Sequence, residues 1–340
     1  MKRALTAVLI GLLMTTACTS NHPLPRDPGK VVLPEPKLAV PGRLYATKHR
    51  GLYQFSGTRV SRLLPQLQLK DPAVLADGTR LAVAQLQGQS STIVITDPTG
   101  KNLESITPSA APEGTLWAFM PSFSGDGRQV AYVSDRGKLR SSPQNLQPND
   151  LSLWVYDRAS RQATRLVTPV AYTGGDSDPG YRPKAANQLI YTTYLYGGRP
   201  LEPVARLSWL STQTGLRVFL SPDGARNFQP AVSPDGRFLA FVHADAGRDD
   251  LYVMPLADSY ARDPQPYPTA AALLMQSGIV AQPVWAPDGS GIAFLMLVNG
   301  SFDLFVLPLA VGSSIQVTGP ARAITHASFL DADSRLAWSS

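Results

Sequence analysis

The chain has 340 residues, of which 44% are hydrophobic and 16% charged, and its formal net charge at neutral pH is +6. Thirty prolines and 27 glycines indicate a globular, turn-rich protein and exclude a disordered chain. The positive charge is modest and dispersed, without the basic stripe typical of nucleic-acid binding. We therefore expect no nucleic-acid partner.

Residues 1–17 have the form of a signal peptide: Lys2 and Arg3, an apolar stretch too short to span a bilayer, and then small residues. Cys18 is the only cysteine, so no intramolecular disulfide can form. Its position resembles the lipid-attachment cysteine of bacterial lipoproteins. The alternative is cleavage after Ala17 that leaves a free thiol. Because a free exposed thiol is a liability in an exported protein, lipidation of Cys18 is favoured.

Residues 18–42 form the next segment, with six prolines between Thr19 and Pro41 and no sustained apolar periodicity. This composition is typical of an extended, semi-rigid tether that buries little surface. We expect an exported lipoprotein of the bacterial cell envelope, membrane-anchored on the periplasmic side. Because Thr19 rather than Asp follows Cys18, the outer membrane is favoured if the source has two membranes.

Five segments of the remaining chain repeat a strand, a tight turn and a second strand. They are Gln229–Val242, Gln282–Leu295, Met120–Val133, Asp71–Ala84 and His326–Ser339. Proline, aspartate and glycine suit successive positions of a hairpin turn, so Asp235 and Asp288 are interpreted as turn residues rather than as catalytic or metal-binding carboxylates. A second strand pair follows most copies, which makes each unit a four-stranded meander of the size of a propeller blade.

Six such units predict an all-β fold, a six-bladed β-propeller of four-stranded antiparallel blades over residues 43–340. We place the starts of the inner strands near Pro72, Pro121, Pro183, Pro230, Pro283 and Ala327. The last blade is expected to be closed by strands from both termini, because this removes open sheet edges. We expect its first two strands from His326–Ser339 and its outer strands from Gly51–Phe55 and Arg59–Leu64. The seam stays open, because Leu44–Thr47 and Leu336–Trp338 both fit its second strand.

The Ser-Pro-Asp-Gly turn, the Leu-Ala-Phe strand after it and the Asp-Leu-Tyr-Val strand beyond resemble the repeats of TolB-type β-propellers. The resemblance covers about Arg43 to Ser340 and implies the fold. It leaves the function open, because similar repeats occur in peptidase propellers and some lyases. TolB proteins also carry a compact α/β domain before the propeller, and the segment between Cys18 and Arg43 is too short for one. The Tol-system role and its partners are therefore not carried over.

No catalytic, cofactor-binding or metal-binding set emerges from the sequence. The four histidines, at positions 22, 49, 243 and 326, are scattered and lack spacing suited to zinc. No Gly-x-Ser-x-Gly motif is present. Two acidic groups, Asp245 with Asp249 and Asp250, and Asp176 with Asp178, are interpreted as loop carboxylates rather than calcium ligands. We expect no cofactor.

Two long connections, Ser134–Asp150 and Thr193–Pro203, are expected on the face opposite the Asp-Gly turns, where binding residues commonly lie on loops. Tyr194, Tyr196 and Arg199 are candidate partner-binding residues; the alternative is that they only cover the third blade. We expect a non-catalytic envelope lipoprotein whose propeller binds a protein or polymer. The alternative is an envelope enzyme, a carbohydrate lyase or hydrolase, with its site in the central funnel. Convergence of at least one histidine and two carboxylates on the ring axis would favour the enzyme.

Overall fold

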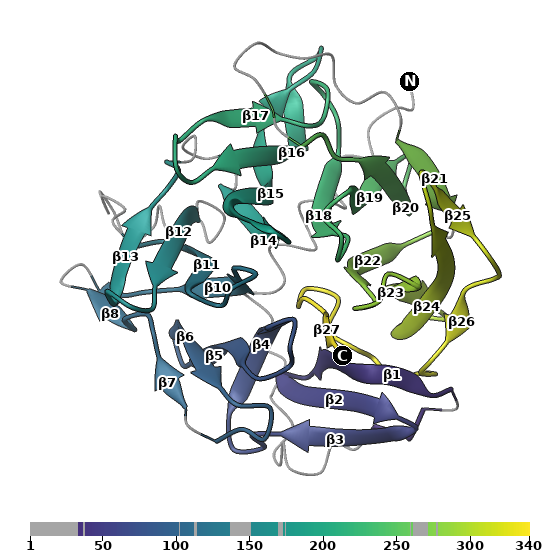
Figure 1. Cartoon of the computed structure of the whole chain (residues 1–340), viewed down its shortest axis with the longest axis horizontal. Helices are drawn as coiled ribbons and strands as arrows, with labels where there is room; N and C mark the ends of the chain where they lie inside the picture. Colours follow the sequence, from purple (N-terminus) through teal and green to yellow (C-terminus); the bar gives the residue numbers. More distant parts are fainter. Residues whose placement is uncertain are drawn as a thin grey trace, which may run out of the picture.

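The computed structural model describes residues 33–36, 38–101, 103–111, 114–136, 151–168, 173, 175–258, 260, 271–276 and 278–340. Throughout these ranges the secondary structure is strand and turn, and six sheets surround a common axis (Figure 1). The predicted six-bladed propeller of four-stranded antiparallel blades is confirmed. The described part of the chain contains no helix long and apolar enough to cross a membrane.

Five blades follow one another in the sequence, and the first strand of each is the innermost. Blade 1 comprises β4 (Gln68–Val74), β5 (Leu81–Gln87), β6 (Ser90–Thr96) and β7 (Glu104–Ser105). Blade 2 comprises β10 (Ala118–Phe123), β11 (Gln129–Ser134), β12 (Ser152–Asp157) and β13 (Gln162–Arg165). Between them lies a short hairpin of β8 (Ala110–Ala111) and β9 (Gly114–Thr115).

The next three blades have the same order of strands. Blade 3 comprises β14 (Asp176–Arg182), β15 (Ala185–Gly197), β16 (Glu202–Ser211) and β17 (Arg217–Phe219). Blade 4 comprises β18 (Asn227–Val232), β19 (Phe238–Asp245), β20 (Arg248–Pro255) and β21 (Ala272–Met275). Blade 5 comprises β22 (Val280–Trp285), β23 (Gly291–Val298), β24 (Ser301–Val311) and β25 (Ile315–Val317), and β26 (Arg322–Ala323) also pairs with β24.

The sixth, closing blade is built from both ends of the chain, as predicted. Its order is β27 (Ala337–Ser339), β1 (Val40–Lys48), β2 (Gly51–Gly57) and β3 (Arg59–Leu63). The expected division was wrong in detail, because the C-terminal part supplies one strand instead of two. Ala327 does not begin an inner strand, since no strand is assigned between β26 and β27. Leu44 pairs with Trp338 across this seam, so the two segments that both resembled a second strand are neighbours.

The inner strand of blade 3 was also misplaced. It runs from Asp176 to Arg182 and contains Pro179, whereas Pro183 and Lys184 form the turn to β15. Lys184 has a φ of 65° there, the role that glycine has in the other turns. The expected loop residues Asp176 and Asp178 therefore lie in a strand beside the axis.

Six apolar clusters hold the ring together, and each lies between two neighbouring blades. Trp338 in β27 belongs to the cluster that joins the closing blade to blade 5, together with Ala293 and Leu295 of β23. Its indole also donates a hydrogen bond of 2.7 Å to the Pro41 carbonyl. Leu33, only 2% exposed, packs in the same cluster. The packed chain thus begins before the expected end of the tether.

The Asp-Gly turns between the first and second strands share one face of the ring, which we call the turn face; we call the opposite end the loop face. In blade 4, Ser233 Oγ donates to Asp235 Oδ1 at 2.6 Å, and the same oxygen accepts the amide of Arg237 at 3.0 Å. Burial raises the pKa of the Asp235 carboxyl, but these bonds and the Arg237 side chain together hold it below its ordinary value. Asp288 accepts the amide of Ser290 in the same way, so the prediction that these are turn carboxylates is confirmed.

A comparison of two glycines tests how closely the Asp-Gly turns contact the next blade. Gly236 lies in such a turn, and Gly247, between β19 and β20, is the control. Both have positive φ, 77° and 83°, but a Cβ at Gly236 would lie 3.1 Å from the Pro183 carbonyl oxygen, whereas one at Gly247 meets nothing within 4 Å. Gly247→Ala is expected to lower the free energy of unfolding by about 1 kcal/mol through backbone strain alone, and Gly236→Ala by about 2 kcal/mol. Urea unfolding measures both, and equal losses would contradict a close contact between blades 3 and 4.

Candidate functional site

The inner strands share a bulge beside the axis, and this feature builds the centre of the ring. In blades 1 to 5 a residue with φ between 52° and 55° precedes a proline, and the pairing register shifts there. These residues are Asp71, Met120, Asp178, Gln229 and Gln282. The left-handed conformation is unfavourable for non-glycine residues, so the surrounding structure must maintain it.

Each bulge residue donates its amide N–H to a side chain of an adjacent blade. The amide of Met120 bonds to Asp71 Oδ2 at 3.2 Å, and that of Gln282 to Gln229 Oε1 at 2.8 Å. The remaining bonds run from Asp71 to Ser334 Oγ, from Asp178 to Met120 Sδ, and from Gln229 to Thr192 Oγ1. The axis is therefore a ring of hydrogen bonds between blades.

The bulge residues Asp71 and Asp178 bring two carboxyl groups to this ring, and the cations Arg335 and Lys70 lie near them. Asp71 accepts the backbone amide of Arg335 on Oδ1 at 3.2 Å, and Lys70 forms an ion pair with Asp333. Burial raises the pKa of Asp71 to about 6, against the opposing charge of Lys70, and burial also raises the pKa of Asp178. The two carboxyl groups therefore take up protons more readily than exposed ones.

A cavity of about 680 Å³ opens from the axis onto the turn face. All six blades contribute to it, and we call it the funnel. Its lining contains many proline and aromatic residues, which include Pro72, Pro121, Pro230, Pro283, Phe123, Tyr181, Trp285 and Trp338. Among the described lining residues only Asp288 and Arg335 have a charged side chain.

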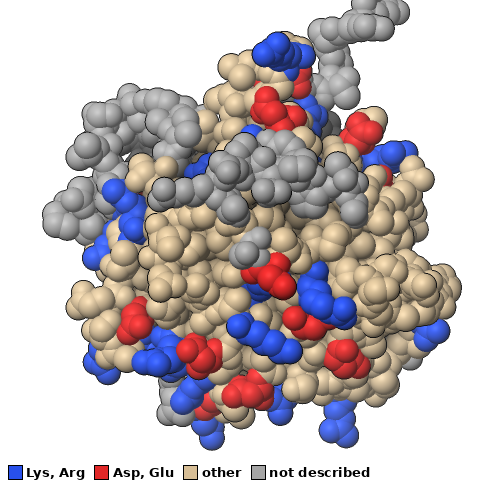
Figure 2. Space-filling view, turned by 45° about the horizontal axis from the view of Figure 1, so that its top comes forward, with Lys and Arg blue, Asp and Glu red and all other residues tan. Residues whose placement is uncertain are grey.

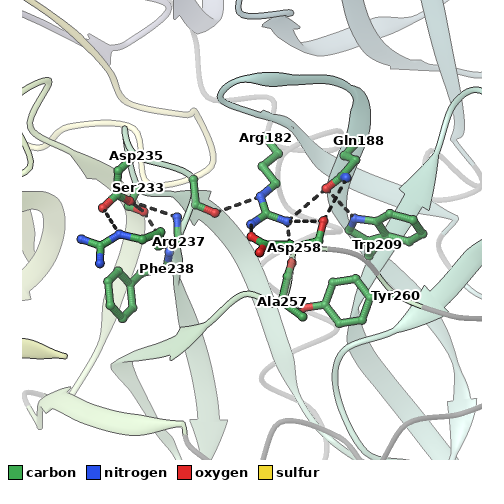
Figure 3. Close-up of polar contacts among 11 residues, drawn as sticks. Arg182, Gln188, Trp209, Ser233, Asp235, Arg237, Phe238, Ala257, Asp258 and Tyr260 are labelled. Carbon is green, nitrogen blue, oxygen red and sulfur yellow. Dashed lines mark hydrogen bonds and ion pairs between the residues drawn. The ribbon is translucent and has the colours of Figure 1, made fainter. Parts of the chain in front are cut away.

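Beside the funnel, Arg182 ties blade 3 to blade 4 (Figure 3). Its Nε donates to the Gly236 carbonyl at 2.9 Å, and its Nη1 donates to the Ala257 carbonyl and to Gln188 Oε1. The same Gln188 oxygen accepts the indole N–H of Trp209. Because this buried arginine is surrounded by acceptors, we assign it a structural role in fixing the rim of the funnel.

The candidate contact residues separate into two groups. Thr193–Pro203 is a hairpin rather than a loop, because β15 continues to Gly197 and β16 starts at Glu202. Tyr196 at 49% exposure and Arg199 lie near its tip on the loop face. Tyr194 is instead turned inward, since burial and the nearby Asp178 raise the pKa of its hydroxyl. Most of the other expected loop, residues 137–150, lies outside the described residues, as does Cys18.

Among the described residues, the acidic loop residues and the histidines considered as metal ligands or catalytic groups do not converge on one site. Asp250 lies 3.5 Å from Arg248 beside the β19–β20 turn, and no group of His, Cys, Asp and Glu suited to a metal ion occurs in the described ranges. His243 Nδ1 lies 2.6 Å from Asn227 Oδ1, and His49 and His326 are exposed. Of the set named for an enzyme, two carboxylates meet on the axis, and none of the described axial groups is a histidine.

The sequence reasoning missed Asp71, Asp178 and Arg335 as axial residues. A signal for the first two was present, because Asp-Pro, Met-Pro, Asp-Pro, Gln-Pro and Gln-Pro mark the bulges of blades 1 to 5. Choosing Pro183 in place of Pro179 hid the third copy. Arg335 has no such signal.

No protein-family model matches the sequence, and no curated protein matches it. Among solved structures, TolB from Acinetobacter baumannii is similar with a TM-score of 0.58 and 16% identity, over 78% of this chain and 61% of that one. A putative TolB from Agrobacterium tumefaciens is similar with a TM-score of 0.54 and 14% identity, over 76% and 87%. This chain has a TolB-like β-propeller fold.

The TolB-like propeller is also similar to hydrazine synthase from Kuenenia stuttgartiensis, with a TM-score of 0.59 and 11% identity, over 80% of this chain and 44% of that one. The chain thus spans about three fifths of the Acinetobacter TolB and less than half of the synthase chain. At such identities the likeness shows the fold alone. It does not choose between a binding protein and an enzyme.

Asp176 provides a test of the buried carboxyl groups. It is 1% exposed, Thr193 Oγ1 donates to its Oδ1 at 3.3 Å, and burial raises its pKa to about 7 from 3.8. The folded state therefore holds a proton that the unfolded state has lost between about pH 4 and pH 7, so stability falls as the pH rises through this interval. Asp176→Asn is expected to raise the free energy of unfolding at pH 8 by on the order of 3 kcal/mol, and to flatten its pH dependence.

Asp126→Asn is the control with the opposite sign, because hydrogen bonds from Ser124 and from the Arg128 amide lower the pKa of Asp126. Its stabilising effect is present at neutral pH and is lost on acidification, so this variant should be weaker than wild type at pH 8 and similar to it in acid. Urea unfolding from pH 4 to pH 8 measures both. Parallel curves for Asp176→Asn and wild type would contradict a protonated Asp176.

Proposed function

We propose that this protein is a non-catalytic, lipid-anchored component of the bacterial cell envelope whose propeller binds a protein partner in the funnel. The observation that carries the proposal is the funnel itself, a cavity of about 680 Å³ lined from all six blades by apolar side chains. Concave apolar sites of this size are typical ligand sites. The lining has few polar groups, which favours a protein segment over a polysaccharide.

The charged side chains of the described surface do not gather into a patch of one sign on the face that Figure 2 shows. Acidic and basic side chains are interspersed there (Figure 2). On the described surface, Arg226 pairs with Glu202 and Arg237 with Asp235. Paired surface charges contribute little to affinity. The tip of the β15–β16 hairpin, with Tyr196 and Arg199, is the second candidate contact surface, on the opposite face of the ring.

A photo-crosslinking residue placed at Ala76 or at Leu201 distinguishes these two faces. Ala76 is exposed and lines the funnel, whereas Leu201 is 70% exposed beside the hairpin tip. In native membranes we expect a partner to crosslink from position 76 and not from position 201. The reverse result would place the partner on the loop face. The Tyr196→Ala, Arg199→Ala double variant, which touches no apolar cluster, should then lose the partner while melting normally.

The anchor is tested separately. Wild-type protein is expected to partition into the membrane fraction, because a diacylated cysteine adds a large apolar area. Cys18→Ser is expected to be released or left unprocessed. Fractionation followed by mass spectrometry of the N-terminal peptide measures this. Equal solubility of the two forms, with an unmodified Cys18 in the mature wild type, would contradict lipidation and leave the partner-binding proposal unaffected.

A further inference from the structure

Arg335 closes the bottom of the funnel. Its Nη1 donates to the carbonyl oxygens of Pro179 at 2.8 Å and Pro121 at 3.3 Å, which belong to the inner strands of blades 3 and 2. Its own segment comes from the opposite side of the ring and leads into β27. The side chain therefore reaches across the axis and is held at both ends.

The guanidinium still has donors to offer. Neither its Nε nor its Nη2 hydrogen-bonds to any described residue, and Arg335 is the one cation among the described residues that line the funnel. An arginine has five N–H donors in a planar fork suited to a carboxylate. The nearby carboxyl groups of Asp71 and Asp178 attract the Arg335 charge without forming a hydrogen bond to its guanidinium. Asp71 accepts the amides of Met120 and Arg335 on its two oxygens, and Asp178 accepts Ser177 Oγ.

The segment before Arg335 occupies the inner position between blades 5 and 1. The Ala332 carbonyl accepts a bond from Gln282 Nε2 at 3.1 Å, and Ser334 Oγ accepts the amide of Asp71 at 2.8 Å. Lys70 and Asp333, next to Asp71 and Ser334 in the chain, form an ion pair. Because the Arg335 side chain reaches across the axis to blades 2 and 3, it lies in the path of a polypeptide that would thread through the ring, and a chain end that enters the funnel meets its guanidinium.

We propose that the funnel binds the C-terminal end of an extended protein chain, with Arg335 pairing with the terminal carboxylate and the proline and aromatic walls contacting the last side chains. The charge at the bottom of the funnel favours the carboxyl end, because the Arg335 guanidinium complements a terminal carboxylate and repels a positive amino terminus. The other charged side chain of the lining, Asp288, lies in the turn of blade 5 on the turn face. This inference rests on the proposed function and names the part of the partner that the funnel recognises.

The test compares two forms of the same ligands on the wild-type protein. A pooled library of random hexapeptides, with apolar residues at the last two positions, is prepared with free C-terminal carboxylates and as C-terminal amides. Peptides retained by immobilised propeller are identified by mass spectrometry, and their affinities are measured by fluorescence polarisation. We expect the free acids to bind at least about tenfold more tightly than their amides, because a charge-assisted bond is lost. Equal affinities, or no binding by either form, would overturn the inference.

Arg335→Gln removes the charge, and Arg335→Lys keeps it without the planar fork. We expect the glutamine variant to bind acid and amide equally, and the lysine variant to retain a smaller preference for the acid. Arg237→Gln is the matched control, since Arg237 is exposed on the turn face but does not line the funnel. If the glutamine variant melts far below wild type, the lysine variant and the acid–amide comparison on wild type still test whether Arg335 pairs with the carboxylate. If a folded Arg335→Gln variant keeps the full preference for free acids, Arg335 does not bind the carboxylate.

The outcome can be separated from that of the proposed function. If a partner crosslinks from position 76 but free acids bind no better than amides, the funnel remains a binding site and only the recognition of a terminal carboxylate is rejected. If a peptide amide with an internal Asp or Glu binds as tightly as a peptide with a free C-terminal carboxylate, recognition of a chain end would likewise be rejected. Loss of crosslinking from position 76 would instead reject the funnel as the partner site.

Discussion

The structure depends on satisfying the backbone amides that face the ring axis. At each inner strand of blades 1 to 5 the chain turns one N–H inward by adopting a positive φ before a proline. A buried amide without a partner costs about as much as a lost hydrogen bond, and the strained backbone adds to that cost. Side chains of adjacent blades accept these amides, so the blades are coupled at the centre as well as through the apolar clusters between them.

The sequence predicted the repeated part of this architecture well. Asp-Gly turns, alternating apolar strands and the count of six all follow from local chemistry, which is why Asp235 and Asp288 were interpreted correctly. Prediction failed where contacts in the folded ring, and not the local sequence, determine the backbone conformation. Lys184 takes the left-handed turn position without being glycine, and the segment between β26 and β27 keeps the spacing of a repeat without forming its first strand.

The axial site was predictable only in part, because its contacts join residues that are far apart in the chain. Asp71 and Ser334, 263 positions apart, form one hydrogen bond, and Arg335 reaches Pro179 over 156 positions. The repeat pattern of the sequence does not indicate which distant residues form such hydrogen bonds. The Asp-Pro dipeptides at Asp71 and Asp178 mark the bulges, but only the closed ring shows that they meet Arg335. The apolar lining of the funnel, in contrast, comes from the inner strands, which the repeat pattern predicts to be buried.

The construction of the closing blade has a consequence for how the molecule is made. β1 is among the earliest strands to be synthesised and β27 is the latest, and the bond from Trp338 to Pro41 spans 297 positions. Contacts of such sequence separation form slowly, because a long loop must be closed first. The closing blade therefore cannot form until β27 has been synthesised, so blades 1 to 5 and β1 to β3 are present before the seam that joins the two ends of the ring.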